Sequence, residues 1–228
     1  MRSREARALR TSWATSLDEV REAQRLRHRV FATEMGATLD PPPGTPAGHD
    51  ADRFDDHAEH LLVRMVDASG EGPVVGTYRV LTPAAARRAG GFYSETEFDC
   101  RRLAGLRSRM AELGRSCIAE EHRTGGTILA LWSALGDFMQ RRGLDMAFGS
   151  ASIPARDGGA RAAALWHRLS ALHLAPLERR VQPFHPLDLS LAHTAGIDSG
   201  EAIAAATPPL VKGYLRTGAE LLGPPAWD

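Results

Sequence analysis

Hydrophobic and polar positions along the chain predict alternating strands and helices. The clearest example runs from Met110 to Trp132, which begins with apolar residues at strand-like positions and breaks at residues 121–126. Apolar residues then recur at the three- and four-residue intervals of a helix face: Ile128, Leu131, Trp132, Leu135, Phe138 and Met139. We expect Thr127 to cap this helix at its start and Gly143 to adopt a left-handed conformation after its end.

The same reasoning divides the rest of the chain into further elements. Ser16 and Glu19 have the spacing of a capping box, and the helix that follows is expected to end near Gly36. Residues 40–48 are rich in proline and glycine and predict a loop. The other expected elements are strands at 60–66 and 74–81, a helix at 83–89, a buried strand at 145–151, a helix at 160–172, a strand at 179–184 and a helix at 208–219.

This succession of strands and helices has no internal repeat and no clear linker, so it predicts one mixed α/β domain. We place that domain at residues 16–228 and expect residues 1–15 to form a flexible leader. The formal net charge is zero, which gives no support for nucleic-acid binding. Cys100 and Cys117 are too far apart for a CxxC pair, and no Cys/His cluster has zinc-like spacing, so no metal site is predicted. Two such cysteines favour a reduced, cytoplasmic protein, with Cys117 as a small core residue.

One candidate site is the start of the helix after residue 123. A strand, a turn with Gly125 and Gly126 and a helix N-terminus together favour an anion, because the first backbone N–H groups of a helix lack internal partners. Arg123 would add a full positive charge. The spacing matches neither a P-loop nor a dinucleotide fingerprint. The alternative is an ordinary turn that uses the two glycines for its geometry.

A second candidate is the charged pair in the preceding strand. Glu112 and Arg115 are three residues apart, so in a regular strand they would face opposite sides. A β-bulge near Gly114 would bring both to one face. The alternative is that each makes an ordinary surface ion pair. An acidic cluster at residues 50–56 is a third candidate, and its alternative is a solvated loop.

The order of several motifs resembles the ornithine–acyl-carrier-protein N-acyltransferase family. The resemblance covers about Leu26 to Ala219, with the motifs in the family's order and at similar spacing. The motifs are Leu26–Phe31, Glu34–Ala37, Phe54–Asp56, His60–Val63, Val75–Leu81, Gly91–Phe98, Glu112–Cys117 and Phe148–Ser152. Because this family is similar to GNAT acyltransferases and acyl-homoserine lactone synthases, the resemblance implies a GNAT-like α/β fold with a mixed, mostly antiparallel sheet flanked by helices. The family usually continues into a further strand past the point matching Pro224–Asp228, so that strand is expected to be missing here.

The resemblance also implies a reaction and a set of roles. A 3-hydroxyacyl group would pass from the acyl-phosphopantetheine of acyl-carrier protein to the α-amine of ornithine, giving lyso-ornithine lipid with no bound cofactor. Acyl-carrier protein and ornithine would be the partners, with peripheral membrane contact through the lipid product. The implied catalytic residues are Glu112, as base or as ligand of the acceptor amine, and Arg115, as its orienting partner or as a phosphate contact. The implied substrate-binding residues are Arg27, Phe31, Asp55, Asp56 and Arg79, and the implied phosphopantetheine-binding residues are Arg123, Gly125, Gly126 and Thr127.

Two alternatives accompany this interpretation. An acyl-homoserine lactone synthase would use similar chemistry but would require S-adenosylmethionine as acceptor. A binding module with a GNAT fold would keep the acyl groove and perform no catalysis. Glu112 and Arg115 argue against the binding module, because it has no need for a base in this strand.

Overall fold

The computed structural model describes residues 8–123, 125–196 and 200–227, and the chain divides into two compact units. The first unit comprises residues 1–92 and 108–149, and the second comprises residues 93–107 and 150–228. The prediction of a single domain over residues 16–228 stays a prediction.

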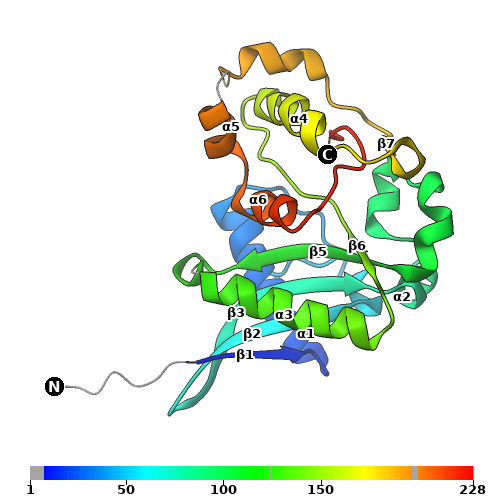
Figure 1. Cartoon of the computed structure of the whole chain (residues 1–228). Coiled ribbons are helices and arrows are strands. Elements are labelled where there is room, and N and C mark those ends of the chain that lie inside the picture. Colours follow the sequence, from blue (N-terminus) through cyan, green and yellow to red (C-terminus); the bar gives the residue numbers. More distant parts are fainter. Residues whose placement is uncertain (1–7, 124, 197–199, 228) are drawn as a thin grey trace. The chain divides into compact units, whose positions relative to one another are not determined.

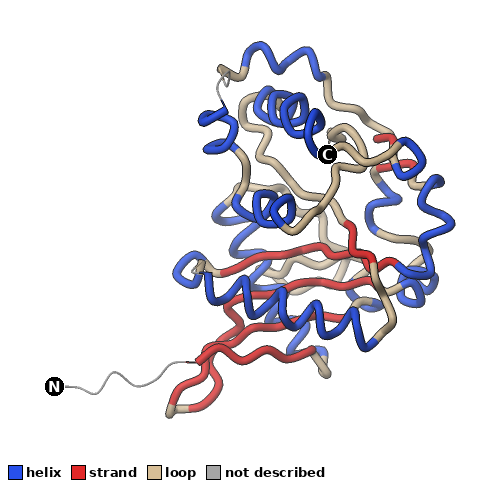
Figure 2. The backbone as a smooth tube through the Cα atoms, viewed as in Figure 1, coloured by secondary structure: helices blue, strands red, loops and turns tan. Residues whose placement is uncertain are grey.

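The first unit is built on a five-stranded sheet with the order β1-β2-β3-β5-β6 (Figure 1). Its neighbouring strands are antiparallel except for β5 and β6, which run parallel. Figure 2 shows β2 and β3 as a long hairpin. This mixed, mostly antiparallel sheet confirms the fold class expected from the sequence. The strands are β1 (Ala8–Trp13), β2 (Glu59–Asp67), β3 (Gly70–Leu81), β5 (Met110–Ile118) and β6 (Met146–Phe148).

Strand β1 corrects the expected leader. Residues 8–13 pair with β2, from Ala8 opposite Val66 to Trp13 opposite Leu61. The ring of Trp13 lies 4.4 Å from that of Phe138, so the strand is also held by packing on its face. The alternation of Leu9, Thr11 and Trp13 with polar residues is the sequence signal for this strand. Residues 1–7 of the expected leader lie outside the described residues.

Helices α1 (Leu17–His28) and α3 (Gly125–Arg141) cover opposite faces of the sheet (Figure 1). The capping box of α1 is confirmed, because the Ser16 hydroxyl accepts from the Glu19 N–H and the Glu19 carboxylate accepts from the Ser16 N–H. After α1 the chain continues as a six-residue π-helix, η1 (Arg29–Glu34). The short helix α2 (Pro83–Arg88) follows β3.

Helix α3 confirms one predicted terminus and corrects the other. Gly143 is left-handed, with φ of 63°, as expected after the last turn. Thr127 is not an N-cap, because the helix already begins at Gly125 and Thr127 is 1% exposed. Its methyl group packs so closely on β3 that a Cβ at Gly76 would lie 3.1 Å from it.

The second unit contains helices and one short two-stranded sheet. The two strands are β4 (Phe98–Asp99) and β7 (Gln182–Pro183), and the helices are α4 (Ala160–His173), α5 (Gly200–Ala206) and α6 (Pro209–Arg216). Helix α4 has the predicted extent but buries mainly alanines. Leu172, near the end of the helix, is 72% exposed. The strand expected at 145–151 is shorter than predicted and only partly buried.

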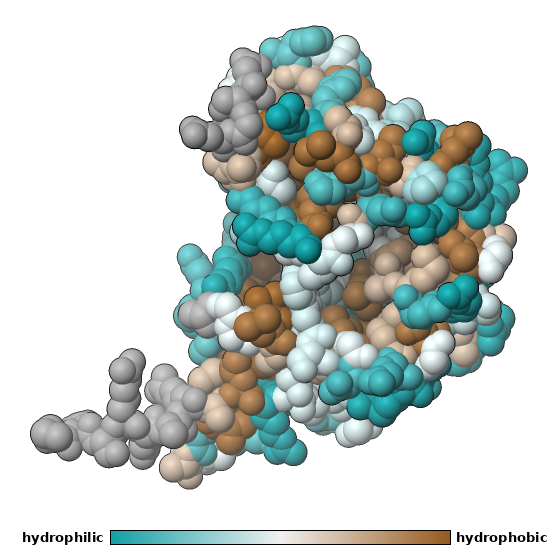
Figure 3. Space-filling view, in the orientation of Figure 1, coloured by the Kyte–Doolittle hydropathy of each residue, from teal (hydrophilic) through white to brown (hydrophobic). Residues whose placement is uncertain are grey.

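The described helices are also too short or too polar to cross a membrane. On the face shown in Figure 3, hydrophobic residues lie in several separate groups among hydrophilic ones. Large apolar side chains that are exposed include Leu129 on α3 and, in the second unit, Leu172, Leu177, Phe184 and Trp227.

Candidate functional site

A β-bulge in β5 places the two charged residues of this strand on one face of the sheet. Thr77 lies opposite Cys117 and Arg79 lies opposite Gly114, so one residue of β3 faces two of β5. The extra residue is Arg115, whose φ of 49° is the positive value of a left-handed backbone. The predicted bulge is therefore confirmed, one residue beyond Gly114.

The register shows which face this is. Glu112 lies opposite Leu81, and Leu81 points to the same side as Arg79, because residues two apart in a strand share a face. Arg79 and Arg115 both form ion pairs with Asp52. Tyr78, which points the other way, lies 3.5 Å from the Trp132 indole nitrogen on α3. Glu112, Arg79 and Arg115 thus share the face covered by α1.

On that face, three arginines and three aspartates form a network of ion pairs, here named the acid–arginine network. Arg27 comes from α1 and is 1% exposed. Its Nε donates to Asp50 Oδ2 at 3.0 Å, and its Nη1 and Nη2 donate to Asp55 Oδ1 at 3.1 Å and Oδ2 at 2.5 Å. Such a fork holds the Asp55 carboxylate in one orientation. The members of the network are Arg27, Asp50, Asp52, Asp55, Arg79 and Arg115.

The two arginines from the sheet complete the network. Arg79 Nη1 donates to Asp52 Oδ1 at 2.5 Å and to Asp55 Oδ1 at 3.0 Å. Arg115 Nη2 donates to Asp52 Oδ2 at 3.1 Å, and its Nε lies 3.7 Å from Asp50 Oδ2. Each aspartate therefore contacts two arginines, and charge is balanced within the network.

The hydrogen-bonding capacity of the Asp55 carboxylate is used up by its partners. Besides Arg27 and Arg79, it accepts from Gln24 Nε2 at 2.9 Å, so each carboxylate oxygen receives two hydrogen bonds. A carboxylate has about four lone-pair positions. Asp55 therefore has no remaining capacity for a further donor.

The arginines keep the network ionised. Burial alone would raise the pKa of Asp55, but the charge and hydrogen bonds of Arg27 and the charge of Arg79 outweigh it and hold that pKa well below its usual range. The pKa of Asp52 is likewise lowered, since Arg79 outweighs burial. Burial would lower the pKa of Arg79, but Asp52 and Asp55 raise it instead. Asp52, Asp55 and Arg79 thus stay charged across the neutral pH range.

The structure brings together some of the predicted site residues and leaves others apart. Arg27, Asp55, Arg79 and Arg115 meet in the network, and Glu112 is buried on the same face. Phe31 is partly buried in the π-helix η1. Asp56 is exposed on the short 3₁₀-helix Asp55–His57 and is not a member of the network.

Four further residues of this site were not predicted individually from the sequence. Asp50 and Asp52 belong to the acidic cluster at residues 50–56, so a weak signal exists for them. Gln24 and His60 have none, because a single polar residue in a helix or strand does not indicate its partner. His60 Nε2 lies 3.1 Å from the carbonyl oxygen of Asp55, to which it must donate.

The predicted anion site lies at the start of α3. Gly125 and Gly126 are exposed there, whereas Thr127 is buried. Arg123 Nε donates to the Ile118 carbonyl at 3.0 Å, and its Nη2 pairs with the carboxylate of Glu34. Arg29 and Glu121 form a second, looser pair at 3.8 Å. Two ion pairs of opposite polarity thus join the π-helix to the segment that precedes α3.

Cys117 has the expected core character. It is 6% exposed, and burial raises the pKa of its thiol to about 12, so almost no thiolate exists at neutral pH.

Within the described residues, no group of three or more His, Cys, Asp or Glu side chains is arranged to hold a metal ion.

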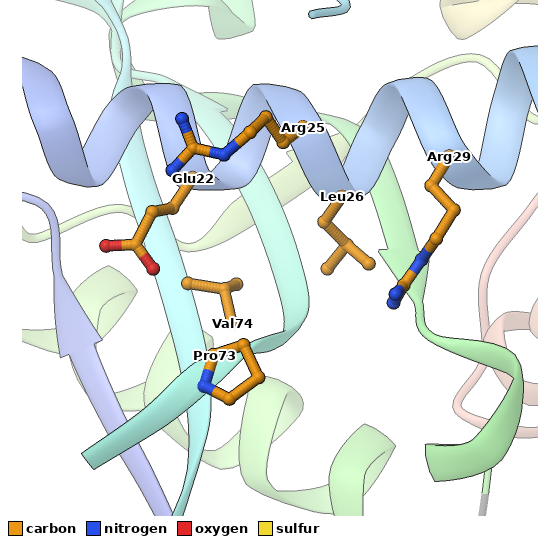
Figure 4. Close-up of a pocket in the computed structure, with 6 residues that line it drawn as sticks. All are labelled: Glu22, Arg25, Leu26, Arg29, Pro73 and Val74. Carbon is orange, nitrogen blue, oxygen red and sulfur yellow. The ribbon is translucent and has the colours of Figure 1, made fainter. Parts of the chain in front are cut away.

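A surface pocket of about 290 Å³ lies between α1 and β3 (Figure 4). Leu26, Pro73 and Val74 form its apolar part. The lining residues Glu22, Arg25 and Arg29 already have partners in Arg64, His49 and Glu121 respectively. The pocket contains none of the predicted site residues.

Comparison with known proteins defines the class of this chain. A family model described as an acetyltransferase (GNAT) domain matches residues 26–133. This stretch includes the network and β5 with its bulge, so the match assigns that part of the chain to the GNAT class. An L-ornithine N(alpha)-acyltransferase from Rhizobium meliloti (strain 1021) is 36% identical over 92% of this chain and 72% of its own length. Another from Brucella abortus (strain 2308) is 37% identical over 93% of this chain and 76% of its own length. The chain belongs to the L-ornithine N(alpha)-acyltransferase family.

Solved structures resemble the chain more distantly. A CoA-dependent acyl-homoserine lactone synthase, BjaI, with MTA matches 98% of this chain and 96% of its own chain, with a TM-score of 0.46 and 16% identity. The AHL synthase LasI matches 70% of this chain and 79% of its own, with a TM-score of 0.46 and 16% identity.

Proposed function

We propose that this protein transfers a 3-hydroxyacyl group from acyl-carrier protein to the α-amine of ornithine, giving lyso-ornithine lipid. The observation that carries this proposal is the 36% and 37% identity, over more than nine-tenths of the chain, to proteins named L-ornithine N(alpha)-acyltransferase. The position of Glu112 on the same face as the acid–arginine network supports it, because an amine acceptor needs a base beside a site for cations.

Glu112 is the proposed base. The α-amine of ornithine is mostly protonated at neutral pH and must lose a proton before it can attack. In the proposed step, the Glu112 carboxylate accepts this proton and the nitrogen bonds to the thioester carbonyl carbon. As the amide forms, the nitrogen gives up its second surplus proton to water. The carbon–sulfur bond breaks and Glu112 passes the first proton to the departing phosphopantetheine thiolate, so charge and atoms balance.

Arg115 is proposed as the residue that orients this arrangement. Its side chain is fixed by Asp52 at 3.1 Å and approaches Asp50 at 3.7 Å, so the bulge that carries it is tied to the network. Arg27, Asp55 and Arg79 then act by holding the acceptor side of the site in a single geometry. Phe31 is proposed to line the same side from η1.

The start of α3 is the proposed site for the phosphate of phosphopantetheine. Exposed glycines at 125 and 126 allow a phosphate to approach the backbone, and the helix dipole favours its negative charge. Arg123 would add charge after exchanging its partner Glu34 for the phosphate. Thr127 is buried and would act by fixing the first turn of the helix against β3.

The test is a reconstituted reaction with purified protein, 3-hydroxyacyl-carrier protein and ornithine, followed by mass spectrometry. We expect N-acylornithine to form. Glu112→Gln should keep donor binding and lose about 10²–10⁴-fold in turnover at saturating substrate, because the change removes basicity at similar volume.

Two outcomes would contradict this proposal. Wild-type turnover in Glu112→Gln would remove Glu112 as the base. Acylation of S-adenosylmethionine with release of a homoserine lactone, and none of ornithine, would replace the proposed acceptor. A cytoplasmic location is part of the same proposal and is supported by two cysteines that are both free thiols.

A further inference from the structure

We infer that Asp52 binds the side-chain ammonium of the acceptor and so selects a diamino acid over a monoamino acid. This inference rests on the proposed function, because it names the residue that recognises the second charge of the acceptor. The sequence resemblance instead directs attention to Asp55 and Asp56, and the contacts of the carboxylates on this face decide among them.

Asp55 and Asp50 are poorly placed to receive a ligand. Each side chain is only 3% exposed. Asp55 accepts four hydrogen bonds from Gln24, Arg27 and Arg79, which fill both oxygens. Asp50 is held by Arg27 at 3.0 Å, and its backbone N–H donates to the Gln24 carbonyl at 3.1 Å. The carboxylates of both residues therefore bind partners inside the network rather than a ligand.

Asp52 lies at the accessible edge of the same network. Its side chain is 18% exposed, six times the fraction of Asp50 or Asp55, and the neighbouring Arg115 side chain is 26% exposed. Oδ1 accepts from Arg79 at 2.5 Å and from the Phe54 N–H at 2.9 Å. Oδ2 accepts from Arg115 at 3.1 Å, and among the described residues it receives this one hydrogen bond. One lone pair of Oδ2 thus remains for an incoming N–H donor.

Charge does not oppose a cation at this position. The three arginines and three aspartates of the network cancel, so the network has no net positive charge that would repel an ammonium beside Asp52. An acceptor with two amines can place one beside Glu112 and the other beside Asp52. Because the pKa of Asp52 is lowered by Arg79 against the effect of burial, its carboxylate stays ionised throughout the neutral range.

The test compares two acceptors that differ by this one charge. 2-Aminopentanoate has the carbon skeleton of ornithine and lacks its side-chain ammonium. We expect wild-type kcat/KM to favour ornithine by about 10- to 100-fold, the range of a charge-assisted hydrogen bond. In Asp52→Asn this preference should fall close to one, mainly through a loss for ornithine.

A structural role for Asp52 would give a different result. If Asp52→Asn lowers kcat/KM equally for both acceptors, Asp52 supports the network and binds no ammonium, and the inference is overturned. Loss of the preference in Asp56→Asn with retention in Asp52→Asn would assign the ammonium to Asp56 and overturn it as well. Asp18→Asn, which removes a carboxylate from the outer surface of α1, is the control for a change of charge alone.

A second variant keeps the test decisive if Asp52→Asn fails to fold. Asp52→Glu retains the charge and moves it outward by one methylene group, so the preference should shift from ornithine toward the shorter 2,4-diaminobutanoate. An unchanged preference in this variant would contradict the inference. If the wild-type enzyme acylates ornithine and 2-aminopentanoate equally well, the inference fails while N-acylation stands. If it acylates neither, the proposed function itself fails.

Discussion

His60 is a buried histidine whose protonation opposes folding. It lies on β2 directly opposite Arg79 and is 2% exposed. Burial lowers the pKa of His60, and the charges of Arg27 and Arg79 lower it further, although Asp55 acts in the opposite direction. The folded protein therefore favours the neutral ring, which donates from Nε2 to the Asp55 carbonyl.

This residue predicts a pH dependence of stability. A histidine in an unfolded chain has a pKa of about 6.5. Below that pH, His60 binds a proton in the unfolded chain but stays neutral in the folded protein. The free energy of unfolding should fall as pH decreases from about 7 toward 5, by at most about 1.4 kcal/mol per pH unit for one proton. His60→Gln keeps a donor near the Asp55 carbonyl and cannot titrate, so its urea-denaturation midpoint should depend less on pH. Parallel profiles for the two proteins would show that His60 is not the group responsible.

Gly149 shows how an element can depend on the absence of one carbon atom. It follows β6, and a Cβ added there would lie 2.1 Å from the Leu113 carbonyl oxygen on β5. The clashing atom belongs to the backbone of β5, so rotation of a side chain could not relieve the clash. The end of β6 can approach β5 this closely only with glycine at that position.

Gly149→Ala should therefore destabilise the protein by about 1–3 kcal/mol, the usual range for overpacking. Gly136→Ala is the matched control, because it is exposed within α3 and an added Cβ meets no atom within 4 Å. That control should be neutral or stabilising by up to about 1 kcal/mol, from helix propensity. Chemical denaturation of both variants gives the comparison. Equal stability of the two variants would contradict the importance of the approach between β5 and β6.

Elements with local causes could be predicted from the sequence, whereas those with distant causes could not. The capping box at Ser16 and the left-handed Gly143 depend on residues within one helical turn, and both are confirmed. The bulge in β5 was expected near Gly114, but its place at Arg115 depends on the register with β3. Strand β1 was missed because a short alternating segment gains stability only from the strand beside it.

The candidate site follows the same rule. Arg27, Asp55, Arg79 and Arg115 were predicted through family motifs, but their mutual pairing depends on how α1, the loop after it and the sheet come together. The saturation of Asp55 and the exposed edge of Asp52 could not be read from an acidic run. The identities of the residues at this site could therefore be predicted from the sequence. Which residue pairs with which, and which carboxylate remains accessible, could not.

At the scale of the whole molecule, charges sum to zero, so any attraction to an acidic carrier protein must come from local groups. The arginine-rich stretch 101–109 is the region that the sequence offers. Within it, Arg101 pairs with Asp99 and Arg107 pairs with Glu95. Arg102 instead donates to the Leu177 carbonyl at 2.8 Å. Because this acceptor is neutral, the hydrogen bond does not neutralise the charge of Arg102.

If this stretch guides the carrier, reversing Arg101 and Arg102 to Glu should raise the KM for acyl-carrier protein on the order of 10-fold at low ionic strength, with kcat little changed. The difference should shrink as salt increases, because screening shortens the reach of charges to about 8–10 Å. Reversal of Arg10 and Arg21, in the first unit, controls for total charge. An unchanged KM in low salt would mean that the carrier binds through other residues.

The acid–arginine network also restricts how this protein can change over generations. Removing one member leaves a buried charge without compensation, which typically costs about 3–5 kcal/mol, while exchanging a whole set for apolar residues is often tolerated. A single substitution at Arg27, Asp55 or Arg79 is therefore expected to lower stability. A second substitution at its partner can recover part of that stability. Such mutual dependence makes these positions epistatic, so descendants of this sequence are expected to keep or replace them as a group.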